Sequence, residues 1–133
     1  MRVYLTFCSA EKNESLKNSG QKVFPEVLYT SQRIQSFMRR CKSANVYWAI
    51  LSDQHGVWFS REKHAWYEKH PNSVSEEEFA ALVTDFNDKL AGFDEIYFCP
   101  GTGEKRVHFL YKRLLGENTL LDRIVWKPFD EIR

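Results

Sequence analysis

The sequence predicts an α/β fold, a three-layer αβα domain with a short, mostly parallel central sheet. Apolar runs typical of strands alternate along the chain with segments of helical periodicity, which implies parallel strands with helices on the sheet faces. The run 46–52, Val-Tyr-Trp-Ala-Ile-Leu-Ser, is almost wholly apolar, as expected for a strand buried on both faces. A length of 133 residues without an internal linker fits one domain over residues 1–133.

The first strand and the first helix lie on either side of a long polar segment. Residues 3–7 are β-branched and aromatic, which predicts a strand, whereas residues 9–26 are mostly polar. A loop of that length inside a domain is often functional or mobile. A helix then begins at a cap supplied by Thr30 or Ser31. Its apolar face is formed by residues at helical spacing: Ile34, Phe37, Met38 and Cys41.

The second half of the chain continues the alternation. Residues 53–72 show no sustained period and predict an excursion that contains a short strand or a helical turn. Ser75 and Glu78 have the spacing of a capping box, so a helix begins there, and Gly92 ends it. The remaining elements are a strand, a helix and a strand, expected at 95–99, 107–116 and 124–126.

Composition and charge exclude several classes of protein. A hydrophobic fraction of 43% with 15% aromatic residues argues against disorder. The net charge is only +1, whereas dedicated non-specific nucleic-acid binders are far more basic. No apolar segment reaches the length of a membrane-spanning helix, so we expect no membrane contact.

The cysteines indicate the redox compartment. Cys8, Cys41 and Cys99 cannot all pair within the chain, and the first apolar run is too short for a signal peptide. We therefore expect reduced thiols in a cytoplasmic protein. The three are far apart and form no C-x-x-C pair, so no metal site is predicted. No motif indicates a cofactor.

The best candidate site lies where the strands end. Ligands of open α/β sheets bind outside the carboxyl ends of the strands, and polar residues follow three strands, at 8–12, 52–56 and 99–106. His55 is a candidate catalytic proton donor or acceptor, and Asp53 is a candidate to orient it or to activate a water. The alternative for His55 is a surface or structural role.

Two further features of these strand ends have open alternatives. Gly101, Thr102 and Gly103 allow backbone amides to point into a loop ahead of a helix, which suits a phosphate or carboxylate; the alternative is an ordinary tight turn. This turn is not a P-loop, because the Gly-Lys-Ser/Thr ending is missing. Cys8 is either a nucleophile with a pKa lowered by Lys12 or an inert, buried thiol.

An ordered set of three short motifs resembles an uncharacterised bacterial, archaeal and phage domain family. The motifs are Phe-Cys-Ser-Ala-Glu-Lys at 7–12, Leu-Tyr-Thr-Ser at 28–31 and Trp-Ala-Ile-Leu-Ser-Asp-Gln-His-Gly-Val at 48–57, followed by Tyr67. The corresponding family patterns are S-C-x-x-K-K, L-Y-x-S and I-L-S-A-K-Y/H-G-L, with a later tyrosine. The family is similar in architecture to the uracil-DNA glycosylase-like superfamily. It is more distantly similar to a domain of archaeosine tRNA-modifying enzymes and to the peroxide-stress family YaaA.

The resemblance implies a site for a nucleobase or nucleotide. Transferred position by position, it implies His55 and these ligand-binding residues: Ser9, Lys12, Tyr29, Ser31, Ser52, Gly56 and Tyr67. The chain departs from the family where Cys8 and Ser9 are in reversed order, where Asn13 replaces the second lysine, and where Asp53-Gln54 replaces Ala-Lys. The water-activating and base-reading motifs of true uracil-DNA glycosylases are missing, so uracil excision is not implied.

The preferred hypothesis is a nucleotide- or nucleobase-binding domain. Base or nucleoside processing related to nucleic-acid modification is the reaction class that the resemblance implies, and the sequence leaves open both enzymatic activity and oligomeric state. The alternative is a non-catalytic protein-interaction module with an aromatic patch within 58–67. Direct binding of nucleic acid through basic side chains of the first helix and of 105–106 ranks third.

Overall fold

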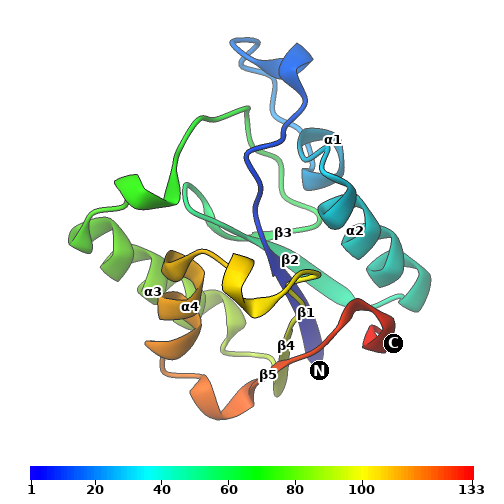
Figure 1. Ribbon diagram of the computed structural model, residues 1–133, viewed down its shortest axis with the longest axis vertical. Helices are drawn as coiled ribbons and strands as arrows, with labels where there is room; N and C mark the ends of the chain where they lie inside the picture. The colour runs from blue at the N-terminus through cyan, green and yellow to red at the C-terminus, as the bar shows by residue number, and fades with distance from the viewer.

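Five strands form one sheet in the order β3-β2-β1-β4-β5 (Figure 1). The computed structural model describes residues 1–133. The central strand β1 (Arg2–Phe7) pairs in parallel with β2 (Tyr47–Ser52) and with β4 (Glu95–Phe98). β5 (Ile124–Trp126) continues the parallel pairing beside β4, and β3 (Gly56–Phe59) pairs antiparallel with β2. The predicted α/β class and the mostly parallel sheet are confirmed.

Helices connect the parallel strands in the order that the sequence predicted. α2 (Gln32–Ala44) joins β1 to β2, α3 (Glu76–Leu90) joins β3 to β4, and α4 (Phe109–Gly116) joins β4 to β5. The chain leaves β1 toward β2 on one side and later places β4 on the other side of β1. The boundary between β1 and β4 is therefore the topological switch point, where ligands of such sheets bind. None of the helices is both long enough and apolar enough to span a membrane.

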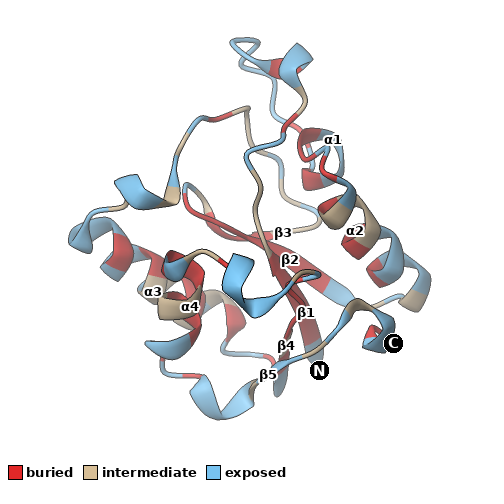
Figure 2. Cartoon of the chain, viewed as in Figure 1, coloured by how far each residue is buried: buried red, intermediate tan, exposed pale blue.

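The buried apolar side chains form two clusters that share the sheet between them. Val3 and Leu5 of β1 pack with α3 and α4, whereas Tyr4 of the same strand packs with α2. This division follows from the alternation of side chains along a strand. Figure 2 shows buried residues along the strands and on the sides of the helices that face them, with exposed residues outside.

Local hydrogen bonds explain where the helices begin and end. The Ser31 hydroxyl accepts from the amide of Ile34 at the start of α2, and Asn45 ends that helix in the left-handed conformation at φ 53°. Ser75 and Glu78 form the predicted capping box of α3. A hydroxyl that accepts an otherwise unpaired amide stabilises a helix start, which is why these boundaries could be read from the sequence.

Two local expectations were incomplete. A helix was expected at 107–116, with its N-terminus near the Gly101–Gly103 turn; α4 begins at Phe109, and the three-residue 3₁₀ helix Glu104–Arg106 separates it from the turn. The backbone of Val107 is extended between them, which interrupts the helix. The polar segment is not structureless, since it contains the 3₁₀ helix Glu14–Leu16 and the short α1 (Pro25–Leu28).

The turn between β2 and β3 is held by an acidic side chain of α3. The Asp85 carboxylate accepts from the amide of Val57 at 2.7 Å and pairs with Lys89 at 2.8 Å. Gly56 sits directly against this carboxylate with φ +69°, and a Cβ at that position would lie 2.2 Å from Asp85 Oδ2. Both the backbone conformation and the space therefore require glycine.

We expect Gly56→Ala to lower the free energy of unfolding by about 1–3 kcal/mol, because the alanine adopts a strained φ and displaces the Asp85 carboxylate. Urea denaturation followed by far-UV circular dichroism measures this loss. Gly92→Ala is the matched control, since a Cβ at Gly92 would meet no atom within 4 Å and its φ is not positive. Equal stability of the two variants would contradict the account.

Candidate functional site

A cavity of about 310 Å³ opens at the carboxyl end of β1. Its walls come from the residues that follow β1 and β2, from the segment before α3, and from the first turns of α2 and α4. The lining residues are Phe7, Cys8, Ser9, Ala10, Lys12, Arg33, Asp53, Lys69, His70, Pro71, His108 and Tyr111. The cavity lies at the switch point of the sheet, where the topology predicts a ligand.

Arg33 joins the two strands at this switch point. Its guanidinium donates to Thr6 Oγ1 at 2.7 Å and to the Phe7 carbonyl at 2.7 Å, both at the end of β1. It also donates to the carbonyl of Pro100, after β4, at 3.1 Å and lies 3.8 Å from the centroid of the Phe7 ring. Burial lowers the pKa of Arg33 to about 10, so the guanidinium stays charged at neutral pH although its acceptors are uncharged.

Asp53 and Cys8 face each other inside the cavity wall. The Cys8 thiol lies 2.9 Å from the hydroxyl of Tyr111 and 3.8 Å from Asp53 Oδ1. Asp53 is only 4% exposed, and its second oxygen, Oδ2, is buried without any hydrogen-bond partner. Such an unpaired acceptor is unfavourable unless a ligand or a water satisfies it.

Burial raises the pKa of both groups. It raises the pKa of Asp53, and the nearby Lys12 ammonium only partly opposes that rise. It also raises the pKa of Cys8, with a further rise from the negative charge of Asp53. Of the two alternatives for Cys8, the raised pKa favours the inert thiol over the nucleophile, because burial dominates. Cys8 is a neutral thiol that contacts a carboxyl group with a raised pKa.

A buried hydrogen-bonded chain supports one wall of the cavity. The hydroxyls of Tyr29 and Tyr67 lie 2.6 Å apart, and Ser52 Oγ donates to Tyr67 at 3.1 Å. Ser52 Oγ also accepts from the amides of Gln54 and His55, which fixes the turn after β2. Burial raises the pKa of both tyrosines. This chain positions the residues that line the cavity.

Lys12 connects that chain to the cavity. Its ammonium lies 4.4 Å from the centroid of the Tyr67 ring, and its backbone bridges to Tyr29. Ser9 also lines the cavity, and its hydroxyl accepts from the amide of Glu11 at 3.1 Å. The structure thus gathers residues that the resemblance implied from four separate segments of the chain.

Other candidate residues lie away from this cavity. Ser31 is buried as the cap of α2, and Gly56 packs against Asp85. Gly101 and Thr102 line a different cavity of about 550 Å³, beside Trp126 and Phe129 at the ends of β4 and β5. Gly103 caps the 3₁₀ helix that follows.

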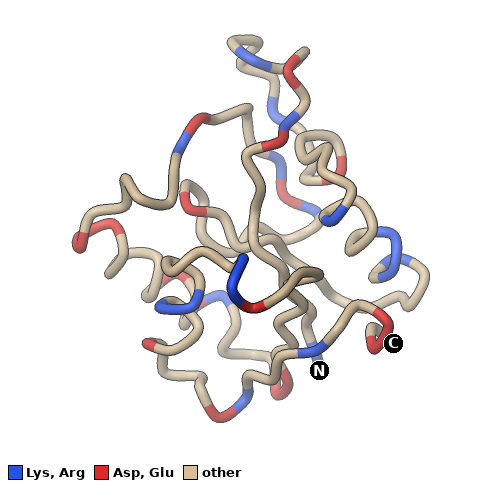
Figure 3. Tube along the Cα trace, in the orientation of Figure 1, with Lys and Arg blue, Asp and Glu red and all other residues tan.

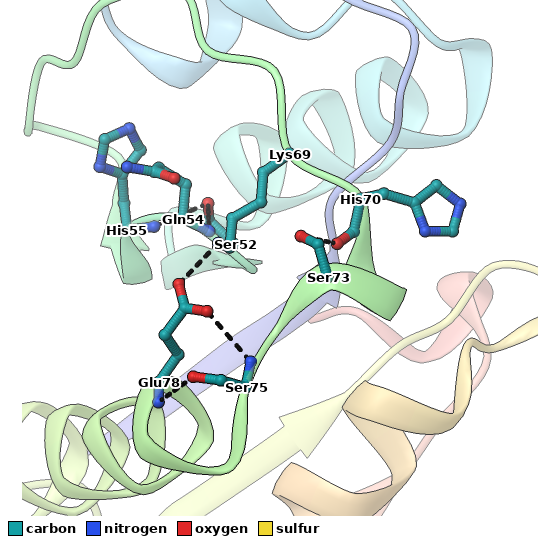
Figure 4. Close-up of polar contacts among 8 residues, drawn as sticks. All are labelled: Ser52, Gln54, His55, Lys69, His70, Ser73, Ser75 and Glu78. Carbon is teal, nitrogen blue, oxygen red and sulfur yellow. Dashed lines mark hydrogen bonds and ion pairs between the residues drawn. The ribbon is translucent and has the colours of Figure 1, made fainter.

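His55 belongs to a separate aromatic cluster. Its ring stacks on that of His64 at 3.9 Å between centroids and 7° between planes, and it meets Trp58 and Tyr67 edge-on. In Figure 4 the side chain of His55 points away from Lys69 and His70. Its Nε2 is buried without a partner, and burial lowers its pKa to about 4. His55 is therefore neutral near pH 7. Asp53, a candidate to orient His55, contacts Cys8 instead.

Among the residues that line the cavity, Tyr111, His70 and His108 were not candidate site residues. Tyr111 lies on the inner face of α4, where an apolar stripe was expected. His70 and His108 each accept a backbone amide on Nδ1, from Asn72 and Leu110 respectively, as caps of short helices. These bonds place the imidazole proton on Nε2 in the neutral form. The feature of the sequence that could have identified His70 and His108 is a histidine directly before a short helix.

The aromatic patch expected within 58–67 is not a continuous surface. Trp58 and Tyr67 are buried, and Phe59 and Trp66 are half-buried. Charges of both signs are spread over the outside of the chain (Figure 3). Comparisons with protein-family models, with curated proteins and with solved structures found no match.

We expect Arg33→Lys to lower the free energy of unfolding by about 2 kcal/mol, because an ammonium cannot reach the acceptors of both strands and leaves buried carbonyls unpaired. Chemical denaturation measures the loss. Arg39→Lys, an exposed change on the same helix, is the control and should shift stability by less than about 0.5 kcal/mol. An Arg33→Lys protein as stable as that control would refute the clamp.

Stability should fall with acidification because His55 is held neutral. The folded-state pKa of about 4 lies below the ordinary value of 6.5, so protons bind the unfolded chain more readily and the folded state weakens between those two pH values. We expect His55→Phe, which keeps a ring against His64, to reduce this loss by about 1–2 kcal/mol between pH 7 and pH 4. Denaturation at a series of pH values tests this; parallel pH profiles would contradict it.

Proposed function

We propose that the chain is a nucleobase- or nucleotide-binding domain of three-layer αβα architecture whose ligand occupies the cavity at the end of β1. The observation that carries the proposal is the buried and unpartnered Oδ2 of Asp53 in the cavity wall. A buried acceptor of this kind fits a ligand that offers an N–H or amino donor. Nucleobases offer such donors along one edge.

The other groups of the cavity fit the same ligand class. Lys12 supplies ammonium donors and His70 supplies an Nε2 proton, so the cavity can donate to acceptors of the ligand while Asp53 accepts. Three residues that line the cavity carry aromatic rings, Phe7, His108 and Tyr111, and aromatic rings favour a planar aromatic ligand. A volume of about 310 Å³ is at the lower end of small-molecule sites.

The proposal extends to base or nucleoside processing. Asp53 has a raised pKa in a partly closed cavity, which is a property of groups that exchange a proton with a substrate. The Tyr111 hydroxyl and the Cys8 thiol lie beside it as further hydrogen-bond partners. Three free cysteines, two of them buried, agree with a cytoplasmic location.

Calorimetric titration with the common nucleobases, nucleosides and nucleotides tests the proposal directly. We expect at least one to bind with a Kd below about 1 mM, a binding free energy of roughly 4 kcal/mol. Asp53→Asn should weaken that binding about tenfold or more, because an amide presents a donor where the ligand donates. Asp88→Asn, an exposed change on α3, should leave it unchanged.

Two outcomes would count against the proposal. If the parent protein bound none of these compounds, the ligand class would be excluded. Equal affinity in Asp53→Asn and Asp88→Asn would show that a ligand binds elsewhere, and the 550 Å³ cavity beside Trp126 would then be the next place to examine.

A further inference from the structure

The cavity at the end of β1 shares a wall with a second hollow. The second one, of about 540 Å³, lies under Trp66 and Gln54 and is bounded by Glu14, Glu68 and Ser73. Both are lined by the same four residues: Ala10, Lys12, Lys69 and His70. We call these two spaces the inner and the outer cavity. The residues between them are thus two lysines, a histidine and a small side chain.

Lys12 is the most unusual of these residues. Its side chain is buried, with 8% of the residue exposed, yet its ammonium makes no hydrogen bond to the protein and lies within 4 Å of no carboxylate. The ammonium lies 4.4 Å from the centroid of the Tyr67 ring, and this cation–π contact uses none of its N–H donors. Lys12 therefore brings a charged donor without a hydrogen-bond partner to the wall of both cavities.

Lys69 and His70, also in the shared wall, differ in the hydrogen bonds that they already make. Lys69 is already paired with Glu78 at 2.7 Å, as Figure 4 shows. His70 uses Nδ1 to accept from Asn72, so its neutral ring presents an Nε2 proton, and Figure 4 shows this ring directed away from the Lys69–Glu78 pair. Lys12 and His70 are therefore the donors left for a ligand.

The charges around the wall favour an anion. Asp53 is the one carboxylate that lines the inner cavity, together with Lys12, Arg33 and Lys69, and Arg33 bonds only to uncharged oxygens. The outer cavity is lined by two carboxylates, Glu14 and Glu68, and Glu68 pairs with Lys17 at 3.6 Å. The inner side of the wall thus carries more positive than negative charge.

We propose that Lys12 and His70 bind a phosphate of the ligand at this shared wall, while the attached base occupies the inner cavity. This inference rests on the proposed function. The phosphate is either the terminal group of a mononucleotide or an internucleotide group. In the second case the next nucleotide enters the outer cavity, where the indole Nε1 of Trp66 is buried without a partner and its ring offers a stacking surface.

Calorimetry with four probe types separates these possibilities: nucleosides, their 5′-monophosphates, dinucleoside monophosphates and ribose 5-phosphate. We expect a 5′-monophosphate or a dinucleoside monophosphate to bind at least tenfold more tightly than the matching nucleoside. In Lys12→Met, the phosphorylated probe and the matching nucleoside should bind with equal affinity, so that the gain is lost. Lys63→Met is the matched control, because the Lys63 ammonium also lies over a ring, that of Phe24, at 4.8 Å.

The probes assign each outcome to one proposal. Equal affinity for a nucleoside and its phosphates would overturn the phosphate site and leave the base-binding function standing. Lys12-dependent binding of ribose 5-phosphate, with no contribution from any base, would support the phosphate site and refute the base-binding function. Binding of none of the probes would overturn both. A gain confined to the dinucleoside monophosphate and lost in Trp66→Ala would identify the internucleotide phosphate.

Melting temperatures show whether a variant that loses binding is still folded. Lys12→Met retains the apolar contact with Tyr67 and removes a buried charge, so we expect its melting temperature to stay within a few degrees of that of the parent. Should Lys12→Met unfold, Lys12→Gln together with His70→Gln provides the same comparison. Retention of the full phosphate gain in that double variant would refute the assignment.

Discussion

The guanidinium of Arg33 is the interaction on which the architecture of the site depends. At a switch point the connections of two adjacent strands leave in opposite directions, so the chain opens a crevice between them. Arg33 connects the two sides of that crevice, because its guanidinium donates both to the end of β1 and to the carbonyl of Pro100 after β4. Its planar donor set reaches several acceptors at once, which an ammonium does not.

The cavity depends on a second constraint, the placement of polar groups that are buried but incompletely paired. The hydroxyls of the Tyr29–Tyr67–Ser52 chain are all hydrogen-bonded, as buried polar networks in a stable fold are expected to be. Next to it, Asp53 Oδ2 is buried without a partner, and the Lys12 ammonium lies over the face of the Tyr67 ring. The hydrogen-bonded groups form the supporting wall of the cavity. The groups without hydrogen-bond partners, a few residues away, form the surface that is open to a ligand.

Sequence reasoning reached the parts of the fold that depend on neighbours along the chain. The caps at Ser31 and Ser75, the apolar stripe of α2 and the buried run of β2 follow from spacing within one segment. It placed the start of α4 at Val107 rather than at Phe109 and missed the 3₁₀ helix before it, because both alternatives satisfy the same short-range pattern. The polar segment also contains more local structure than its composition indicates.

The sequence by itself determined the α/β class, the order of the elements and the strand ends near which a site is expected, since these follow from periodicity and capping. Only the tertiary structure decided which of the strand-end residues meet. It placed Asp53 against Cys8 and Tyr111, stacked His55 on His64, and turned Arg33 from a helix-face charge into the clamp of two strands. These contacts join residues far apart in the chain, and side-chain direction across a sheet is fixed by register and packing.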